Sequence, residues 1–271
     1  MLQRDPKSHK GQNGRVAIIG GSHRFHGAPI FSALAAEASG VDLIFPVVHR
    51  CNEAVTLGAS LNFIVHTFEG NSLTEGDAER VLSLLEHVDS CVIGPGMAET
   101  PENIEAISRI VFGVHCPLIL DAAALHLSVL GGRTKEQTVI LTPHKGELAR
   151  LVRKDLSSLA RNEMTALAEL VADEHHAVVL LKGHEDFIVD VSGRTKTVKG
   201  GNAGLTKGGT GDTLAGLIAG LIAQKMDPFD ACVLGTTIIK KAGEKIYKTK
   251  GYAYTTREII CLIPEILRAS H

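Results

Sequence analysis

The sequence predicts a single α/β domain in which a doubly wound, mostly parallel sheet is flanked by helices. Short runs of β-branched and apolar residues alternate with helical patterns almost throughout the 271 residues. Runs that are apolar on both faces and separated by helices are typical of a parallel sheet covered on both sides. No linker, internal repeat or low-complexity tract divides the chain, so we expect one domain over residues 1–271.

The expected elements follow one another as βαβ units. Strands are predicted at Arg15–Ile19, Val41–Val47, Leu61–Thr67, Ser90–Gly94, Leu118–Asp121, Thr138–Leu141 and Ala177–Lys182. Helix-like segments between them include Pro29–Ser39, Asp77–His87, Asn103–Val111 and Asn162–Glu174. In the last segment, apolar residues recur at the i, i+3 and i+4 spacing of a helix face.

The pattern changes after the last of these strands. Phe187–Val191 and Thr195–Val198 flank a Ser-Gly-Arg turn and predict a β-hairpin near the end of the sheet. Residues 200–204 are glycine-rich and predict a loop. Helical patterns then cover Asp212–Gln224, Pro228–Lys248 and Thr256–Arg268, so the domain is expected to finish in a helical segment.

Charge and composition exclude several classes of protein. The 28 Lys and Arg residues nearly balance the 30 Asp and Glu residues, which leaves no bulk attraction to nucleic acid or to an anionic membrane. The longest mostly apolar run, Leu214–Ala223, is too short to span a bilayer. The polar N-terminus lacks the apolar core of a signal peptide, so we expect a cytoplasmic protein.

The 5 cysteines and 13 histidines do not predict a metal site. No CxxC pair or zinc-ribbon spacing occurs among the cysteines, and the histidines form no cluster at ligand spacing. We therefore expect free thiols in a reducing compartment and no metal ligands among the side chains.

Glycine or polar residues follow many of the predicted strands. They are Gly20-Gly21-Ser22, Gly94-Pro95-Gly96, Asp121-Ala122-Ala123, Thr142-Pro143-His144-Lys145-Gly146-Glu147 and Lys182-Gly183. In an open parallel sheet, ligands bind beyond the carboxyl ends of the strands. We therefore expect these segments to line one site at that edge.

The strongest single motif is Lys207-Gly208-Gly209-Thr210-Gly211-Asp212-Thr213, which opens an apolar helix. Backbone N–H groups of a glycine-rich loop that leads into a helix N-terminus converge on an anion such as phosphate. Asp212 lies in the first turn, where a carboxylate either caps the helix or acts on a hydroxyl that accepts a phosphoryl group. The P-loop, GxGxxG, GxSxG and HExxH motifs are absent.

A GTGD motif on a late helix of a doubly wound domain resembles the ribokinase-like superfamily. Within it, the chain resembles the NAD(P)H-hydrate dehydratases, and the likeness extends over nearly all of its length. The segments that carry this resemblance occur in the order of that family and are Gly20-Gly21-Ser22, Gly27-Ala28-Pro29, Gly94-Pro95-Gly96, the 142–147 segment, Lys182-Gly183 and Gly201-Asn202-Ala203-Gly204.

The resemblance implies a metabolite-repair lyase. Its substrate would be the S epimer of the hydrated cofactors NADHX and NADPHX, with Mg²⁺ and an adenine nucleotide that donates its terminal phosphoryl group to the hydrate hydroxyl. Loss of phosphate would then restore NADH or NADPH. We expect ADP rather than ATP, because the compact chain resembles prokaryotic members. We also expect a homo-oligomer, a tetramer, and no N-terminal epimerase domain, because the first strand begins so early.

Carried over position by position, the resemblance implies roles for individual residues. Asp212 would be the base at the reacting centre, and Ala28, Gly96 and His144 would contact the hydrate together with it. The residues expected to bind the nucleotide are Lys182, Gly183, His184, Glu185, Asp186, Gly209, Thr210 and Gly211.

Several positions depart from the family's pattern. Asp186 stands where a threonine is often found, which puts the expected nucleotide contact in question. Lys207 replaces a small residue, and it either adds a phosphate contact or is solvated. Ala203 stands where a proline is common, and Phe25-His26 where a tyrosine and one further residue precede the Gly-Ala pair.

Two other functions stay open on the sequence alone. The first is a ribokinase-like small-molecule kinase that phosphorylates a vitamin-precursor alcohol, which would accumulate a stable phosphomonoester. The second is a nucleotide-binding module without catalytic activity. Asp212 beside intact glycines argues against the module, because binding alone does not require a carboxylate next to an anion.

Overall fold

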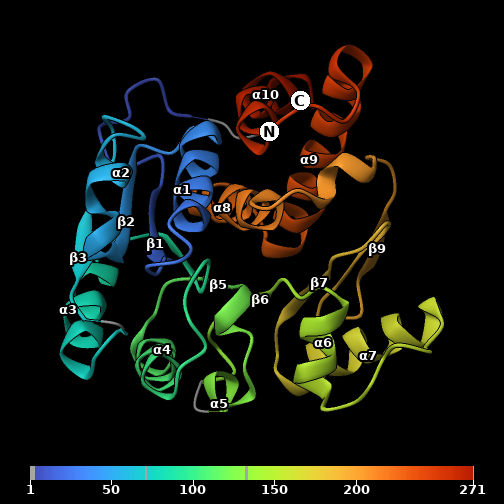
Figure 1. Cartoon of the computed structure of the whole chain (residues 1–271), viewed down its shortest axis with the longest axis horizontal. Helices are drawn as coiled ribbons and strands as arrows, with labels where there is room; N and C mark the ends of the chain where they lie inside the picture. Colours follow the sequence, from blue (N-terminus) through green and yellow to red (C-terminus); the bar gives the residue numbers. More distant parts are fainter. Residues whose placement is uncertain (1–3, 71, 132–133, 271) are drawn as a thin grey trace.

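The fold is built on one mixed sheet, seen in a computed structural model that describes residues 4–70, 72–131 and 134–270 (Figure 1). Within these residues the sheet has 9 strands in the order β3-β2-β1-β4-β5-β6-β7-β8-β9. The strands are β1 (Arg15–Gly20), β2 (Leu43–His49), β3 (His66–Phe68), β4 (Ser90–Ile93), β5 (Leu118–Leu120), β6 (Val139–Leu141), β7 (Val178–Leu181), β8 (Asp186–Val189) and β9 (Thr195–Val198).

Neighbouring strands from β3 through β7 are parallel, whereas β8 and β9 add an antiparallel hairpin at one edge. This confirms the doubly wound, mostly parallel sheet. The strand order reverses at β1, which pairs with β2 on one side and with β4 on the other. Ligands of open α/β sheets bind at such a reversal, outside the carboxyl ends of the strands.

Helices cover both faces of the sheet, and Figure 1 shows the two layers on opposite sides of the strands. One layer contains α1 (Gly27–Ala38), α8 (Thr210–Ala223), α9 (Pro228–Lys250) and α10 (Thr256–Ala269). The other contains α3 (Glu75–Leu85), α4 (Pro101–Gly113), α5 (Leu127–Leu130), α6 (Lys145–Val152) and α7 (Arg161–Glu174). Side chains alternate along each strand, so Ile18 packs into the first layer and Ile19 into the second.

Helix α8 is buried along nearly its whole length and packs closely against α1. A Cβ atom on Gly216 would lie only 2.0 Å from the carbonyl oxygen of Ser32, so glycine is needed for this approach. The Ser32 hydroxyl in turn donates a hydrogen bond of 2.8 Å to the carbonyl oxygen of Asp212. These contacts fix the N-terminus of α8 against the start of α1.

Some predicted boundaries were wrong. The strand predicted at Leu61–Thr67 begins only at His66, and Leu61 is fully exposed. The chain turns here after the short helix α2 (Glu53–Leu57), where the Ser60 hydroxyl accepts the N–H of Asn62. The predicted loop at 200–204 contains the start of a 3₁₀ turn, Ala203–Thr206. The N–H of Gly204 donates to the Asn202 side chain and starts that turn.

All 5 cysteines are free thiols, as expected: Cys51, Cys91, Cys116, Cys232 and Cys261. Across the described residues, no helix combines the length and the apolar character needed to cross a membrane.

Candidate active site

Asp212 is the third residue of α8, which begins directly after the glycine-rich loop. The N-cap is Gly209, with φ 90°, which has no side chain to cap the helix. Asp212 lies in the first turn, where its own backbone N–H donates to its carboxylate, so the helix-cap alternative stays open beside the catalytic one. A Cβ atom on Gly209 would lie 2.4 Å from Cδ2 of Phe31, so this residue must be glycine for both conformation and space.

Lys182, just after β7, lies at the centre of a cluster of carboxylates. Its Nζ is 2.7 Å from Oδ1 of Asp121 and 3.8 Å from Oε2 of Glu147. A Cβ atom on Gly211 would lie 3.4 Å from the same Nζ, which places the ammonium group against the first turn of α8. Burial lowers the pKa of Lys182, but the charges of Asp121, Glu147 and Asp212 outweigh it and raise the pKa, so this lysine is cationic.

The pKa of Asp212 is raised to about 7, first by burial and then by the negative charge of Asp121, while Lys182 acts in the opposite direction. A carboxyl group with such a pKa exchanges a proton readily near neutral pH. This is the property that a general base requires. Because the group also stands beside the helix N-terminus, it is placed to act on a hydroxyl near a bound anion.

Asp121 and Glu147 lie in segments that were expected to line the site, but neither residue was given a role. Asp121 follows β5 and is buried; it accepts a 2.8 Å hydrogen bond from the Thr142 hydroxyl. Glu147 is buried in the first turn of α6 and accepts the N–H of His144 at 2.8 Å. Their sequence position could have identified them, because each lies in one of the polar segments that follow predicted strands.

The residues expected to contact the hydrate lie at neighbouring strand ends. A Cβ atom on Gly96 would lie 2.9 Å from Cβ of Ala28 and 2.6 Å from the carbonyl oxygen of Phe25, so the loop after β4 packs directly on the start of α1. His144 is the N-cap of α6, and its Nδ1 accepts the N–H groups of Gly146 and Glu147. Its side chain is largely exposed, and its backbone pairs with that of Lys182.

A buried carboxylate, that of Asp186, accepts a backbone hydrogen bond from the loop that follows Lys182. Asp186 accepts the N–H of Gly183 at 2.7 Å and pairs with Nζ of Lys240 at 3.1 Å. The Glu185 carboxylate pairs with Arg161 and with Lys199. Both acidic side chains expected at the nucleotide site therefore bind protein groups, whereas Gly183 and His184 are exposed.

Lys207 lies beside two tyrosines rather than free in solvent. Its Nζ donates to the carbonyl oxygen of Tyr252 at 2.7 Å and lies 4.9 Å from the centre of the Tyr254 ring. These contacts occupy the ammonium group on the protein itself. They give a reason for the lysine at this position that does not require a phosphate contact.

Two polar atoms near the glycine-rich loop are buried without a hydrogen-bond partner in the described residues. They are the Thr210 hydroxyl and the Asn202 amide nitrogen. Buried polar groups are almost always satisfied, so such atoms call for a partner. A Cβ atom on Gly208 would meet no heavy atom within 4 Å, so the loop borders open space. The helix amides that border this space and the neighbouring Lys182 ammonium group suit the phosphate groups of a nucleotide.

Known proteins resemble this chain along nearly its whole length. The family described as NAD(P)H-hydrate dehydratase matches residues 16–265. An ADP-dependent (S)-NAD(P)H-hydrate dehydratase from Nitrosopumilus maritimus is 37% identical over 97% of this chain and 90% of its own length. A protein of the same description from Cenarchaeum symbiosum is 33% identical over 96% of this chain and 91% of its own.

A solved structure agrees with these relatives. The ADP/ATP-dependent NAD(P)H-hydrate dehydratase of Bacillus subtilis, co-crystallized with ATP/Mg²⁺, aligns with a TM-score of 0.85 and 25% identity. The alignment covers 99% of this chain and 94% of that one. Both the sequence and the fold therefore lead to one conclusion: the chain belongs to the NAD(P)H-hydrate dehydratase family.

Proposed function

We propose that the protein is an ADP-dependent dehydratase that repairs the S epimer of hydrated NADH and NADPH. The observation that carries this proposal is Asp212, a carboxyl group with a pKa of about 7 at the end of a glycine-rich loop and beside the cationic Lys182. The relatives described as ADP-dependent (S)-NAD(P)H-hydrate dehydratases support the choice of substrate and nucleotide.

In the first step, the hydroxyl oxygen of the hydrate attacks the terminal phosphorus of ADP. Asp212 accepts the hydroxyl proton, an O–P bond forms, and the bond from phosphorus to the bridging oxygen breaks to release AMP. The backbone amides at Gly209–Gly211 and the Lys182 ammonium group stabilise the negative charge on the transferred group. Ala28, Gly96 and His144 are proposed to hold the hydrate, and the exposed Gly183 and His184 to contact the nucleotide.

In the second step, the bond between carbon and the phosphate oxygen breaks. Phosphate leaves with the bonding electron pair, the neighbouring ring carbon loses a proton, and the ring double bond of the dihydronicotinamide is restored. Phosphate is a far better leaving group than hydroxide. This difference explains why a dehydration would consume a nucleotide at all.

Mg²⁺ is proposed to enter with the nucleotide, because Asp121 and Glu147 already pair with the Lys182 ammonium group and magnesium usually keeps several waters and binds through substrate phosphates. When bound, Mg²⁺ would neutralise phosphate charge during the transfer. The tetramer and the cytoplasmic location stay predictions of the resemblance and of the sequence.

The proposal is tested by incubating the purified protein with (S)-NADHX, ADP and Mg²⁺. The absorbance of the dihydronicotinamide should reappear, with one phosphate and one AMP formed per molecule repaired. The R epimer serves as the control and should not react. A stable phosphomonoester that accumulates from a vitamin-precursor alcohol, with no repair of the hydrate, would instead establish the kinase alternative.

A further inference from the structure

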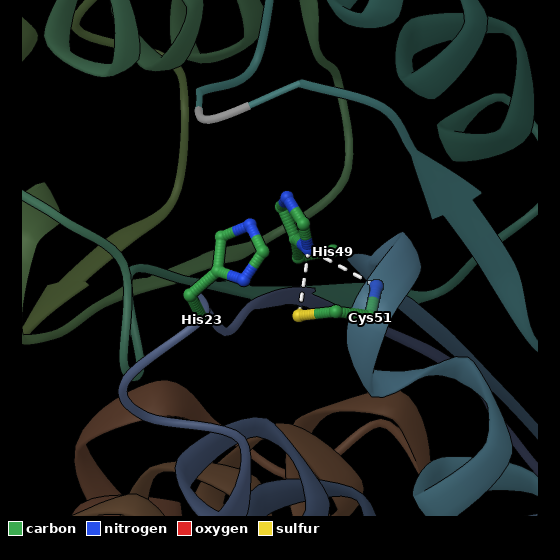
Figure 2. A group of neighbouring side chains, drawn as sticks. All are labelled: His23, His49 and Cys51. Atoms are coloured by element: carbon green, nitrogen blue, oxygen red, sulfur yellow. Dashed lines mark hydrogen bonds between the residues drawn. The ribbon is translucent and has the colours of Figure 1, made fainter.

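Two histidines and a cysteine meet at the carboxyl ends of β1 and β2, outside the carboxylate cluster around Lys182 (Figure 2). His23 lies in the loop after β1, His49 ends β2, and Cys51 lies in the 3₁₀ turn Arg50–Asn52. Their ligand atoms all lie within 4.8 Å of one another. The parallel pairing of β1 with β2 brings together residues that are far apart in the sequence.

His49 is the buried member of the group, and its two ring nitrogens have distinct roles. Its Nε2 contacts the carbonyl oxygen of Gly70, which accepts a proton but has none to donate. The ring proton therefore resides on Nε2 when the imidazole is neutral, and Nδ1 carries the lone pair. That Nδ1 lies 2.9 Å from Sγ of Cys51 and accepts the backbone N–H of Cys51 at 3.1 Å, a hydrogen bond that a metal ion would have to replace. A histidine whose outer N–H binds a backbone carbonyl is held as metal-bound histidines are.

His23 completes a triangle of donor atoms. Its ring centre lies 4.3 Å from that of His49, with the ring planes tilted by 53°. Figure 2 shows its ring beside His49 and above the sulfur of Cys51. Asn52 holds the two loops in place, because its side chain contacts Cys51 Sγ at 3.2 Å and donates to the carbonyl oxygen of Ser22 at 3.1 Å.

We propose that His23, His49 and Cys51 bind a zinc ion. Imidazole nitrogens and a thiolate are the ligands that zinc prefers, and three protein ligands leave a fourth tetrahedral position for water. Tetrahedral bonds of the usual lengths would separate Nδ1 of His49 from the sulfur by about 3.5 Å. The observed 2.9 Å has to open only slightly. Cys51 and His23 are exposed, so both side chains are able to adjust.

Binding has a defined proton balance. The Cys51 thiol loses its proton to the solvent as the bond between sulfur and zinc forms, while both histidines bind as neutral imidazoles. No electrons are transferred. The ion would connect the loop after β1, which leads into α1, to the end of β2. The proposal rests on these three side chains alone and stands whether or not the proposed dehydratase activity is found.

The test is a titration of the full chain, without a histidine tag, by calorimetry with Zn²⁺ in two buffers of different ionisation enthalpy. We expect one ion per chain and release of about one proton per ion. Co²⁺ in place of Zn²⁺ should produce a thiolate-to-metal charge-transfer band. The variants Cys51→Ser, His49→Ala and His23→Ala should each weaken binding by at least about 10- to 100-fold, and Cys51→Ser should abolish both the band and the proton release.

Matched controls are Cys261→Ser, which removes the other exposed cysteine, and His115→Ala, which removes an exposed histidine elsewhere. Both should bind Zn²⁺ as the unaltered chain does. Because His49 is buried, thermal unfolding without metal has to show that His49→Ala folds; the exposed Cys51 and His23 variants carry the test if it does not. The proposal is overturned if the unaltered chain shows no charge-transfer band, or if Cys51→Ser retains the affinity.

Discussion

Asp186 and Lys240 form a buried ion pair, with 3.1 Å between Oδ2 and Nζ. Asp186 also accepts the N–H of Gly183, and Lys240 donates to the carbonyl oxygen of His184 at 3.0 Å and that of Gly200 at 3.4 Å. A single pair on β8 and α9 thus holds two loops beside the proposed nucleotide site. Asp186, which stands where the resemblance leads us to expect a threonine, therefore has a buried partner of its own in Lys240.

The first prediction concerns this pair. Lys240→Met leaves the Asp186 carboxylate buried and unpaired, so the free energy of unfolding should fall by about 3–5 kcal/mol. Asp186→Thr should also destabilise the chain, whereas the double variant should recover much of the loss. Urea unfolding of all three variants measures the coupling. The control is Lys245→Met, which lies on α9 like Lys240 and breaks an exposed pair with Glu265 of α10; it should cost less than about 1 kcal/mol. If Lys240→Met and Asp186→Thr each lower the free energy of unfolding by less than about 1 kcal/mol, the prediction is wrong.

The second prediction compares two adjacent glycines. Gly209→Ala introduces a side chain at φ 90° and against the Phe31 ring, so it should destabilise the chain by about 1–3 kcal/mol and weaken nucleotide binding. Gly208→Ala points into open space and should change stability by less than about 0.5 kcal/mol. Thermal unfolding with and without ADP tests both. Equal effects of the two substitutions would show that the loop does not require the left-handed conformation at 209.

The third prediction concerns the pH dependence of turnover. A base must be deprotonated to act, so kcat/KM should fall as the pH drops below the Asp212 pKa of about 7. Asp121→Asn removes a negative charge that raises this pKa and frees Lys182 to lower it further. The acid limb of the profile should therefore move to lower pH. If Asp121→Asn folds and the acid limb of its profile stays at the same pH, Asp212 is not the group whose ionisation sets that limb.

The fourth prediction concerns stability. The pKa of Asp212 is higher in the folded chain, about 7, than its ordinary value of 3.8, so the folded state binds the proton more tightly. Stability from this group is present at low pH and is lost as the pH rises from about 4 to 7. The Asp212→Asn variant has no carboxyl group at this position and should not lose this stability. Its free energy of unfolding, relative to that of the unaltered chain, should therefore rise by up to about 3 kcal/mol between pH 5 and pH 8. Urea unfolding at both values should show this growth; a constant difference would refute it.

The sequence predicts local features of this site well and long-range partners poorly. The glycine-rich loop and Asp212 are adjacent in the chain, and Lys182 directly follows a strand, so short patterns reveal them. Asp121 is also visible after a strand, but its contact with Lys182 depends on which strands pair.

Partners that meet only in the folded chain left no sequence signal. Lys240 lies on α9, and nothing in the helical periodicity indicates a buried lysine or its contact with Asp186. His23, His49 and Cys51 have no recognisable ligand spacing, because the pairing of β1 with β2 brings them together. The strand predicted from Leu61 onward failed for a different reason. The segment is apolar, but Leu61 is exposed, and an apolar composition alone does not show whether a residue is buried.

The central claim is that Asp212 acts on the hydrate hydroxyl during phosphoryl transfer, and the most direct test is the turnover of Asp212→Asn with (S)-NADHX and ADP. Asparagine keeps the size of the side chain but does not accept the proton, so kcat should fall about 10²- to 10⁴-fold. The affinity for ADP should stay within a few-fold or increase, because a negative charge near the phosphates is removed. A kcat above about one tenth of the unaltered rate would contradict the general-base role.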